Sequence, residues 1–101
     1  MAIVQFSVAP VGTGSPSVGD WVVKLSETVR KSGIKNRLTP MSTILEGDLK
    51  EILDLIRKIH EETFSDECKR VITDIKIDDR TDKPLTMDGK IQRVEKGLTG
   101  E

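Results

Sequence analysis

Along the chain, the spacing of apolar residues changes between a pattern typical of strands and a pattern typical of helices. Apolar and polar residues alternate over residues 2–8 and again over residues 69–80, which predicts two β-strands. Pro10 is expected to end the first strand. The last strand would extend roughly 40 Å at about 3.3 Å per residue, which is longer than its neighbours would be able to pair.

Helical spacing of apolar residues predicts two long amphipathic helices and one short helix. The first is expected over about residues 18–32, with Ser17 as its N-cap and Gly33 after its last turn. The second follows Asp48, which forms a capping-box spacing with Glu51. The short C-terminal helix is marked by an apolar stripe of Met87, Ile91, Val94 and Leu98.

Between the long helices, the stretches KNRLTP and MSTILEG are either two short strands or one strand bent at Pro40. The order of elements is then strand, helix, strand, strand, helix, strand and a small helix. This order predicts an α+β fold, a ferredoxin-like βαββαβ antiparallel sheet with both long helices on one face. The length fits a single domain over residues 1–101.

The second face of this sheet is expected to have no cover within the chain. It would be half apolar, and such a surface is usually closed by a partner or a ligand. Together with the long last strand, this favours a homo-oligomer. The residues expected on this face are Ile3, Gln5, Ser7, Ile44, Ile72 and Asp74.

Composition narrows the classes of function. Sixteen Lys and Arg against 17 Asp and Glu give a net charge of -1, so no strong field would attract nucleic acid. The apolar runs are too short for a membrane span and the N-terminus lacks the features of a signal peptide, so a cytoplasmic location is expected. One cysteine, Cys68, and one histidine, His60, form no cluster at metal-ligand spacing, so no metal site is expected.

Few side chains are candidates for catalysis. His60 is expected to be packed or to lie at the edge of its helix, and Cys68 is expected to be inert. The glycines of residues 12–19 match no phosphate-binding pattern, which leaves a simple turn or a loop that closes over a ligand. Glu46 ends an apolar strand just before a helix, so its carboxylate is either solvated or offered to a cation or an N–H donor. It has no evident acid–base partner, so no catalytic residue and no enzyme activity are expected.

Three stretches, taken in order, resemble a known family. They are SVAPVGTGSPSVGDWV, LTPMSTILEG followed by an amphipathic helix, and VITDIKIDDRTDKP, and they cover nearly the whole chain. They resemble the small thiamine-binding protein family, the YkoF-like group. The most specific matches are Pro10, Gly12 and Ser17 in the first stretch and residues 43–47 in the second. The sequence departs from the family pattern at positions 41 and 42.

The resemblance implies a dimer of dimers that binds thiamine, or its hydroxymethylpyrimidine moiety, without transforming it and with no further cofactor. The alternative is a structural or interaction protein whose open sheet face serves only for oligomerisation. A thiamine site needs hydroxyl or backbone partners, one carboxylate and an apolar or aromatic surface. The candidate ligand-binding residues are Ser7, Ser42 and Thr43 for hydroxyls, Glu46 for the carboxylate, and Trp21 or Met41 for the apolar surface, with Trp21 also a candidate for the core.

Overall fold

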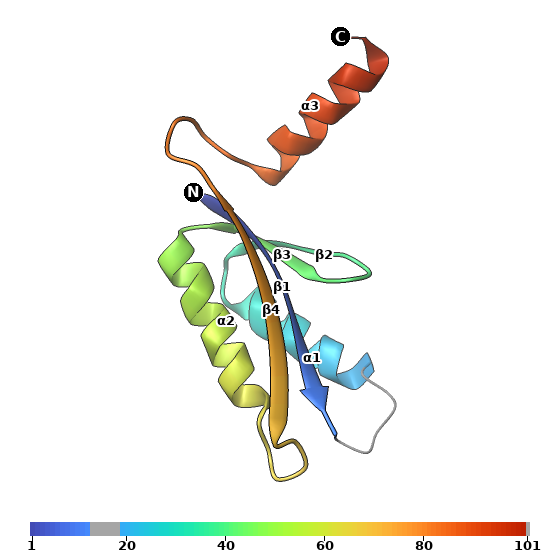
Figure 1. The fold of residues 1–101 in the computed structure, drawn as a ribbon, viewed down its shortest axis with the longest axis vertical. Helices are drawn as coiled ribbons and strands as arrows, with labels where there is room; N and C mark the ends of the chain where they lie inside the picture. Colours follow the sequence, from blue (N-terminus) through green and yellow to red (C-terminus); the bar gives the residue numbers. More distant parts are fainter. Residues whose placement is uncertain (13–18, 101) are drawn as a thin grey trace.

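The fold is an antiparallel sheet covered on one face by two helices (Figure 1). The computed structural model describes residues 1–12 and 19–100, so Ser17, the predicted N-cap, lies outside it. The strands lie in the order β2-β3-β1-β4, which confirms the predicted α+β ferredoxin-like arrangement. The elements are β1 (Ala2–Val11), α1 (Gly19–Lys31), β2 (Lys35–Leu38), β3 (Thr43–Gly47), α2 (Leu49–Thr63), β4 (Arg70–Asp79) and α3 (Met87–Thr99).

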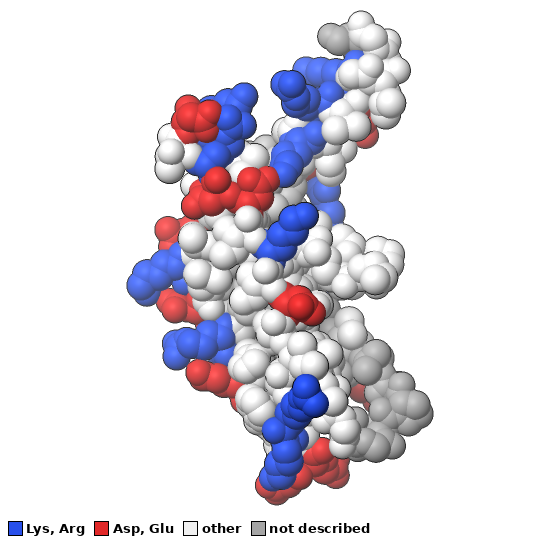
Figure 2. All heavy atoms as spheres, in the orientation of Figure 1, with Lys and Arg blue, Asp and Glu red and all other residues white. Residues whose placement is uncertain are grey.

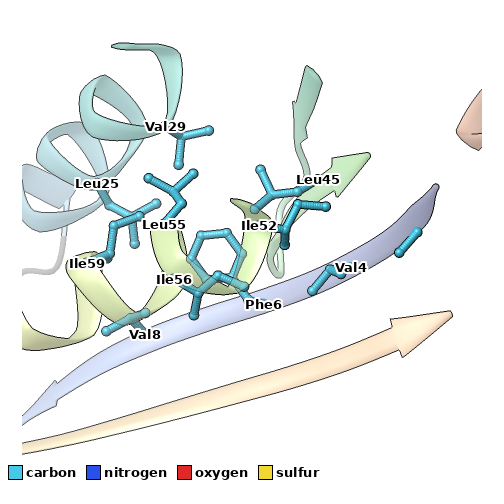
Figure 3. Close-up of a cluster of buried hydrophobic side chains, with 11 residues drawn as sticks. Val4, Phe6, Val8, Leu25, Val29, Leu45, Ile52, Leu55, Ile56 and Ile59 are labelled. Carbon is cyan, nitrogen blue, oxygen red and sulfur yellow. The ribbon is translucent and has the colours of Figure 1, made fainter. Parts of the chain in front are cut away.

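The core lies between the sheet and helices α1 and α2 (Figure 3). Every second residue of β1 points toward the helices, as strand alternation predicts. The predicted cap of α2 is confirmed, because the Asp48 carboxylate accepts the Glu51 N–H at 3.1 Å. The main core residues are Val4, Phe6 and Val8 of β1, Leu25 and Val29 of α1, Leu45 of β3, and Ile52, Leu55, Ile56 and Ile59 of α2.

Strand β1 is longer than predicted. It continues through Pro10 to Val11, so the prediction that Pro10 ends the strand is wrong. It pairs with β4 over all ten residues but with β3 only as far as Phe6. A proline is tolerated beyond that point because no described strand pairs with one edge of β1 there. The expected excess length of the last strand is also wrong, since β1 matches the whole of β4.

The stretch between the helices forms two antiparallel strands joined by a tight turn, not one bent strand. In the turn, the Thr39 N–H donates to the Ser42 carbonyl at 2.9 Å. Leu45 belongs to the core, so the alternation of β3 directs Ile44 and Glu46 to the face of the sheet away from α1 and α2. We call this second surface the open face.

The chain itself covers part of the open face, so the expectation that this face lacks a cover within the chain is wrong. After β4 the chain crosses back over the sheet, and Leu85 and Met87 pack against Ile3, with Ile44 beside them. This small apolar cluster is separate from the main core. It fixes the start of α3 on the sheet.

Glu46 anchors the first turn of α3. Its side chain is only 5% exposed, and its carboxylate accepts the Met87 N–H at 2.7 Å and lies 3.2 Å from Lys35 Nζ. A carboxylate at a helix N-terminus also complements the helix dipole. Asp88 adds an exposed ion pair with Arg37 at 2.9 Å. These contacts attach α3 to β2 and β3.

Beyond its first turn, α3 leaves the sheet and projects from the rest of the molecule (Figure 1). The longest dimension is accordingly 53 Å, against 28 and 21 Å in the other directions. Residues 88–99 are all exposed. Within residues 1–12 and 19–100, no helix is both long and apolar enough to cross a membrane.

Replacing Glu46 by alanine is expected to loosen α3. The Met87 N–H would lose its partner in a buried position, at a cost of about 1–3 kcal/mol in the free energy of docking. Hydrogen exchange of residues 85–91 and the free energy of unfolding in denaturant measure this change. Glu27→Ala, which removes an exposed glutamate on α1, is the matched control. Unchanged protection of residues 85–91 in the Glu46 variant would contradict the role of this anchor.

The attachment of α3 is also expected to weaken in acid. The hydrogen bond from Arg37 and the charge of Lys35 hold the pKa of Asp88 below its ordinary value. The stabilisation is therefore present above the unfolded-state pKa and is lost as the pH falls through the lower folded-state pKa. Protection of the first turn of α3 should fall below about pH 4. Asp88→Asn should show a smaller response to acid, and an identical response would refute this contribution.

Candidate functional site

Five of the six candidate ligand-binding residues line one hollow at the edge of the sheet. This hollow, the edge pocket, has a volume of about 140 Å³ and lies between β1, α1 and the turn that joins β2 to β3. Apolar side chains of the main core form its inner wall. The five predicted residues that line it are Ser7, Trp21, Met41, Ser42 and Thr43.

The edge pocket exists because the two neighbours of β1 differ in length. Strand β3 begins at Thr43, opposite Phe6, whereas β1 continues to Val11. Beyond Phe6, no described strand pairs with this edge of β1. Trp21 covers part of that edge, and its Nε1–H donates to the Val8 carbonyl at 3.2 Å. The indole also packs against the main core, so Trp21 belongs both to the core and to the pocket wall.

The turn between β2 and β3 is fixed by hydrogen bonds centred on Thr39. Its hydroxyl donates to the Ser42 carbonyl at 2.9 Å and accepts the N–H groups of Met41 and Ser42 at 3.3 and 3.1 Å. The Met41 side chain projects from this turn and is 87% exposed. A flexible thioether held on a fixed backbone can adapt to an apolar surface brought against it.

A second hollow of about 150 Å³ adjoins the edge pocket on the open face. Ser7, Met41 and Ser42 line both hollows. The second hollow adds Asp74 of β4, which stands directly opposite Ser7 in the pairing of β1 with β4. None of the ion pairs between described residues includes Asp74. Its carboxylate is therefore available to a cation in this hollow, where Lys76 is the charged neighbour.

Glu46, the sixth candidate, lines neither hollow. It faces the open side as the strand pattern allowed, and it does contact a cation and an N–H donor, but both belong to its own chain. The carboxylate that lines the second hollow is Asp74, which was not among the predicted ligand-binding residues. Strand alternation already predicted Asp74 and Ser7 on the same face, and the register of β1 against β4 was the missing information.

A larger hollow lies between α3 and the open face, with a volume of about 460 Å³. Its size falls within the range of small-molecule sites, and Ile3, Ile44 and Ile91 contribute apolar surface. Its charged lining is mainly basic, however, which is unfavourable for a cationic ligand such as thiamine. The charged residues that line it are Arg37, Lys76, Lys90 and one acid, Asp78.

His60 and Cys68, the remaining candidates for chemistry, make contacts that stabilise the fold. His60 is packed as predicted, with Nδ1 at 2.6 Å from the Thr73 hydroxyl and its ring edge-on to Phe64. Cys68 is buried, and its thiol donates to the Arg70 carbonyl at 3.3 Å. Among the residues that the structure describes, no His, Cys, Asp and Glu side chains are grouped to hold a metal ion. Most of the predicted glycine-rich turn lies outside the described residues.

Known proteins match this chain over nearly its whole length. A family model described as thiamine-binding protein matches residues 4–95, which include the edge pocket. The UPF0045 protein in the glkA 3'region of Staphylococcus xylosus is 45% identical over 97% of this chain and 95% of its own length. The UPF0045 protein YqgV of Bacillus subtilis is 43% identical over 97% of this chain and 98% of its own length.

The crystal structure of protein MJ1052 from Methanocaldococcus jannaschii has the same fold. It superposes with a TM-score of 0.84 and 34% identity over 93% of this chain and 95% of that one. The family match and the similarity to these relatives extend over nearly the whole chain. The protein belongs to the thiamine-binding protein family.

Proposed function

We propose that the protein binds thiamine, or its hydroxymethylpyrimidine moiety, and releases it unchanged, acting as a homo-oligomer. The observation that supports this most directly is the convergence of five candidate residues, from three separate parts of the chain, on the edge pocket. The family match gives independent support for the class of ligand.

The aminopyrimidine ring is the part of thiamine that suits the edge pocket. A volume of about 140 Å³ is below the roughly 300–1,000 Å³ typical of sites for larger ligands, so it suits a single ring. Trp21 and Met41 offer the apolar surfaces for its faces. Ser7, Ser42 and Thr43 offer hydroxyls, which both donate and accept, to the amine and ring nitrogens.

The thiazolium ring would then lie in the adjoining hollow. Asp74 supplies the carboxylate that a cation requires there, and Ser7 lies between the two hollows. The attraction is partly screened by solvent because Asp74 is exposed. Glu46 has no part in this arrangement, since its carboxylate holds α3.

The chemistry of the pocket favours binding without reaction. General acid–base catalysis requires a titratable group positioned on a reacting atom, and nucleophilic catalysis requires a base beside the nucleophile. The described lining of the edge pocket contains hydroxyls but no titratable side chain, and the adjoining hollow adds only Asp74 and Lys76.

The edge and the exposed isoleucines of β4 support the proposed self-association. Among the strands that the structure describes, none pairs with the outer edge of β4, and long exposed edges readily pair with another chain. Three isoleucines of β4 are 44–46% exposed, namely Ile72, Ile75 and Ile77. The same surfaces favour the second candidate function, an assembly or interaction protein without a ligand, and a binding measurement separates the two.

Binding is expected to quench the fluorescence of Trp21. It is the only tryptophan and the chain contains no tyrosine, so intrinsic emission reports on the edge pocket alone. Titration with thiamine and with hydroxymethylpyrimidine should each give saturable quenching, with matching heats in calorimetry and unchanged ligand by mass spectrometry. Absence of both quenching and heat at millimolar ligand would refute ligand binding and leave the assembly function.

Asp74→Asn is expected to weaken the binding of thiamine but not the binding of the pyrimidine alone. Removing the carboxylate should weaken thiamine binding roughly tenfold, in line with about 1.5 kcal/mol for a hydrogen bond to a charged group. Binding of the neutral pyrimidine should be unchanged, because it does not reach Asp74. Asp79→Asn, an exposed acid at the end of the same strand, is the control. Equal losses for both ligands would contradict the assignment of the thiazolium to this hollow.

A further inference from the structure

The apolar stripe of α3 continues past the surface that its own chain covers. Met87, at the start of the stripe, is 5% exposed and packs against the open face. Exposure then rises along the helix, to 44% for Ile91, 62% for Val94 and 82% for Leu98. Large apolar side chains in a row on a projecting helix indicate a surface that is covered by another molecule. In Figure 2, Lys and Arg lie along one side of this helix and uncharged atoms cover much of the other.

The spacing of the stripe is that of a coiled-coil seam. Steps of four, three and four residues separate Met87, Ile91, Val94 and Leu98, which corresponds to the heptad positions d, a, d and a. An amphipathic helix that only covers a sheet usually has a wider apolar face, which includes e or g positions as well. Here the positions that flank the seam are polar or glycine, so the stripe is narrow enough to suit another helix.

The charges beside the seam specify the kind of helix that fits. The e positions are Asp88 and Glu95, and the g positions are Lys90 and Gly97. In a parallel pair, a g residue faces the e residue five positions later in the partner helix, so Lys90 would face Glu95 of the partner subunit. In an antiparallel pair, e faces e and g faces g, which would bring together residues of like charge.

We propose that α3 pairs in parallel with α3 of a second copy of this chain, through Ile91, Val94 and Leu98. Each copy would contribute one Lys90, which remains beside Asp78 of its own β4 and gains Glu95 of the partner subunit. The inference rests on the self-association proposed above, and it names the surface and orientation, but it does not depend on ligand binding. The stretch from Ile91 to Leu98 is too short to associate firmly alone, so the pair adds to other contacts between copies.

A charge placed in the seam tests the surface. Leu98→Asp removes a side chain that is 82% exposed, so the fold of a single copy should be unaffected and its circular dichroism unchanged. Sedimentation equilibrium of the full chain should show at least a tenfold weaker self-association. Gln92→Asp places the same charge on the helix at a b position, away from the seam, and should associate like the unmodified protein.

A charge reversal tests the orientation. Glu95→Lys would place two cations against each other in a parallel pair and should weaken association, whereas in an antiparallel pair the new cation would meet Asp88 and strengthen it. As a second measurement, Val94→Cys in a Cys68→Ser background should oxidise to a dimer through equivalent d positions. Stronger association of the Glu95 variant, or failure of this crosslink in a chain that still associates, would overturn the parallel arrangement.

The outcomes also distinguish this inference from the proposed function. If the unmodified chain remains an 11.2 kDa monomer at millimolar concentration, both the α3 pair and the proposed self-association are refuted, whatever the thiamine titration gives. If it self-associates and Leu98→Asp associates equally well, only the α3 pair is overturned. Loss of association in Leu98→Asp but not in Gln92→Asp supports it.

Discussion

The pairing of β1 with its two neighbours determines most of what the molecule presents to its surroundings. β1 is bonded to β4 along all ten residues and to β3 along only five. The full pairing fixes which side chains of β4 share a face with those of β1, and it sets Ser7 against Asp74. The partial pairing leaves the far half of β1 open at one edge, where Trp21 and the β2–β3 turn enclose the edge pocket. One strand thereby holds the core on one face and positions polar groups on the other.

Two carboxylates on the same face of the sheet, those of Glu46 and Asp74, have different roles. Glu46 and Asp74 both belong to the open face, but they lie at different ends of it. Glu46 is buried beneath the start of α3, where the basic groups of Lys35 and Arg37 gather with Asp88. Asp74 stays exposed beside the edge pocket. The buried carboxylate of Glu46 therefore has a structural role, whereas the exposed carboxylate of Asp74 is accessible to a ligand.

Sequence reasoning predicted the fold well because the signals for helices and strands are local. The cap at Asp48, the apolar periods of the helices and the alternation in β1 and β4 each depend on a few neighbouring residues. It failed at Pro10, because whether a proline ends a strand depends on which edge is paired. Which edge of β1 is paired depends on how the strands align in the sheet, and the identity of Pro10 does not reveal it.

The candidate site was predicted in part for the same reason. Chemical type alone indicates candidate side chains in β1, α1 and the turn, and five of them line the edge pocket. The sequence indicates Glu46 as the carboxylate because it ends a strand beside a helix, and nothing in the local sequence shows that α3 returns to cover it. The contact from Glu46 to Met87 spans 41 positions, so only the tertiary structure reveals it.

This long-range anchor also bears on the order in which the chain folds. Its acceptor is presented only after β3 has found its register against β1, so α3 has no place to dock until the sheet exists. The main core lies on the opposite face of the sheet and does not require α3. Helix α3 should therefore join last during folding and detach first in the native state, as a separate cooperative unit whose opening exposes the open face while the helix-side core stays intact.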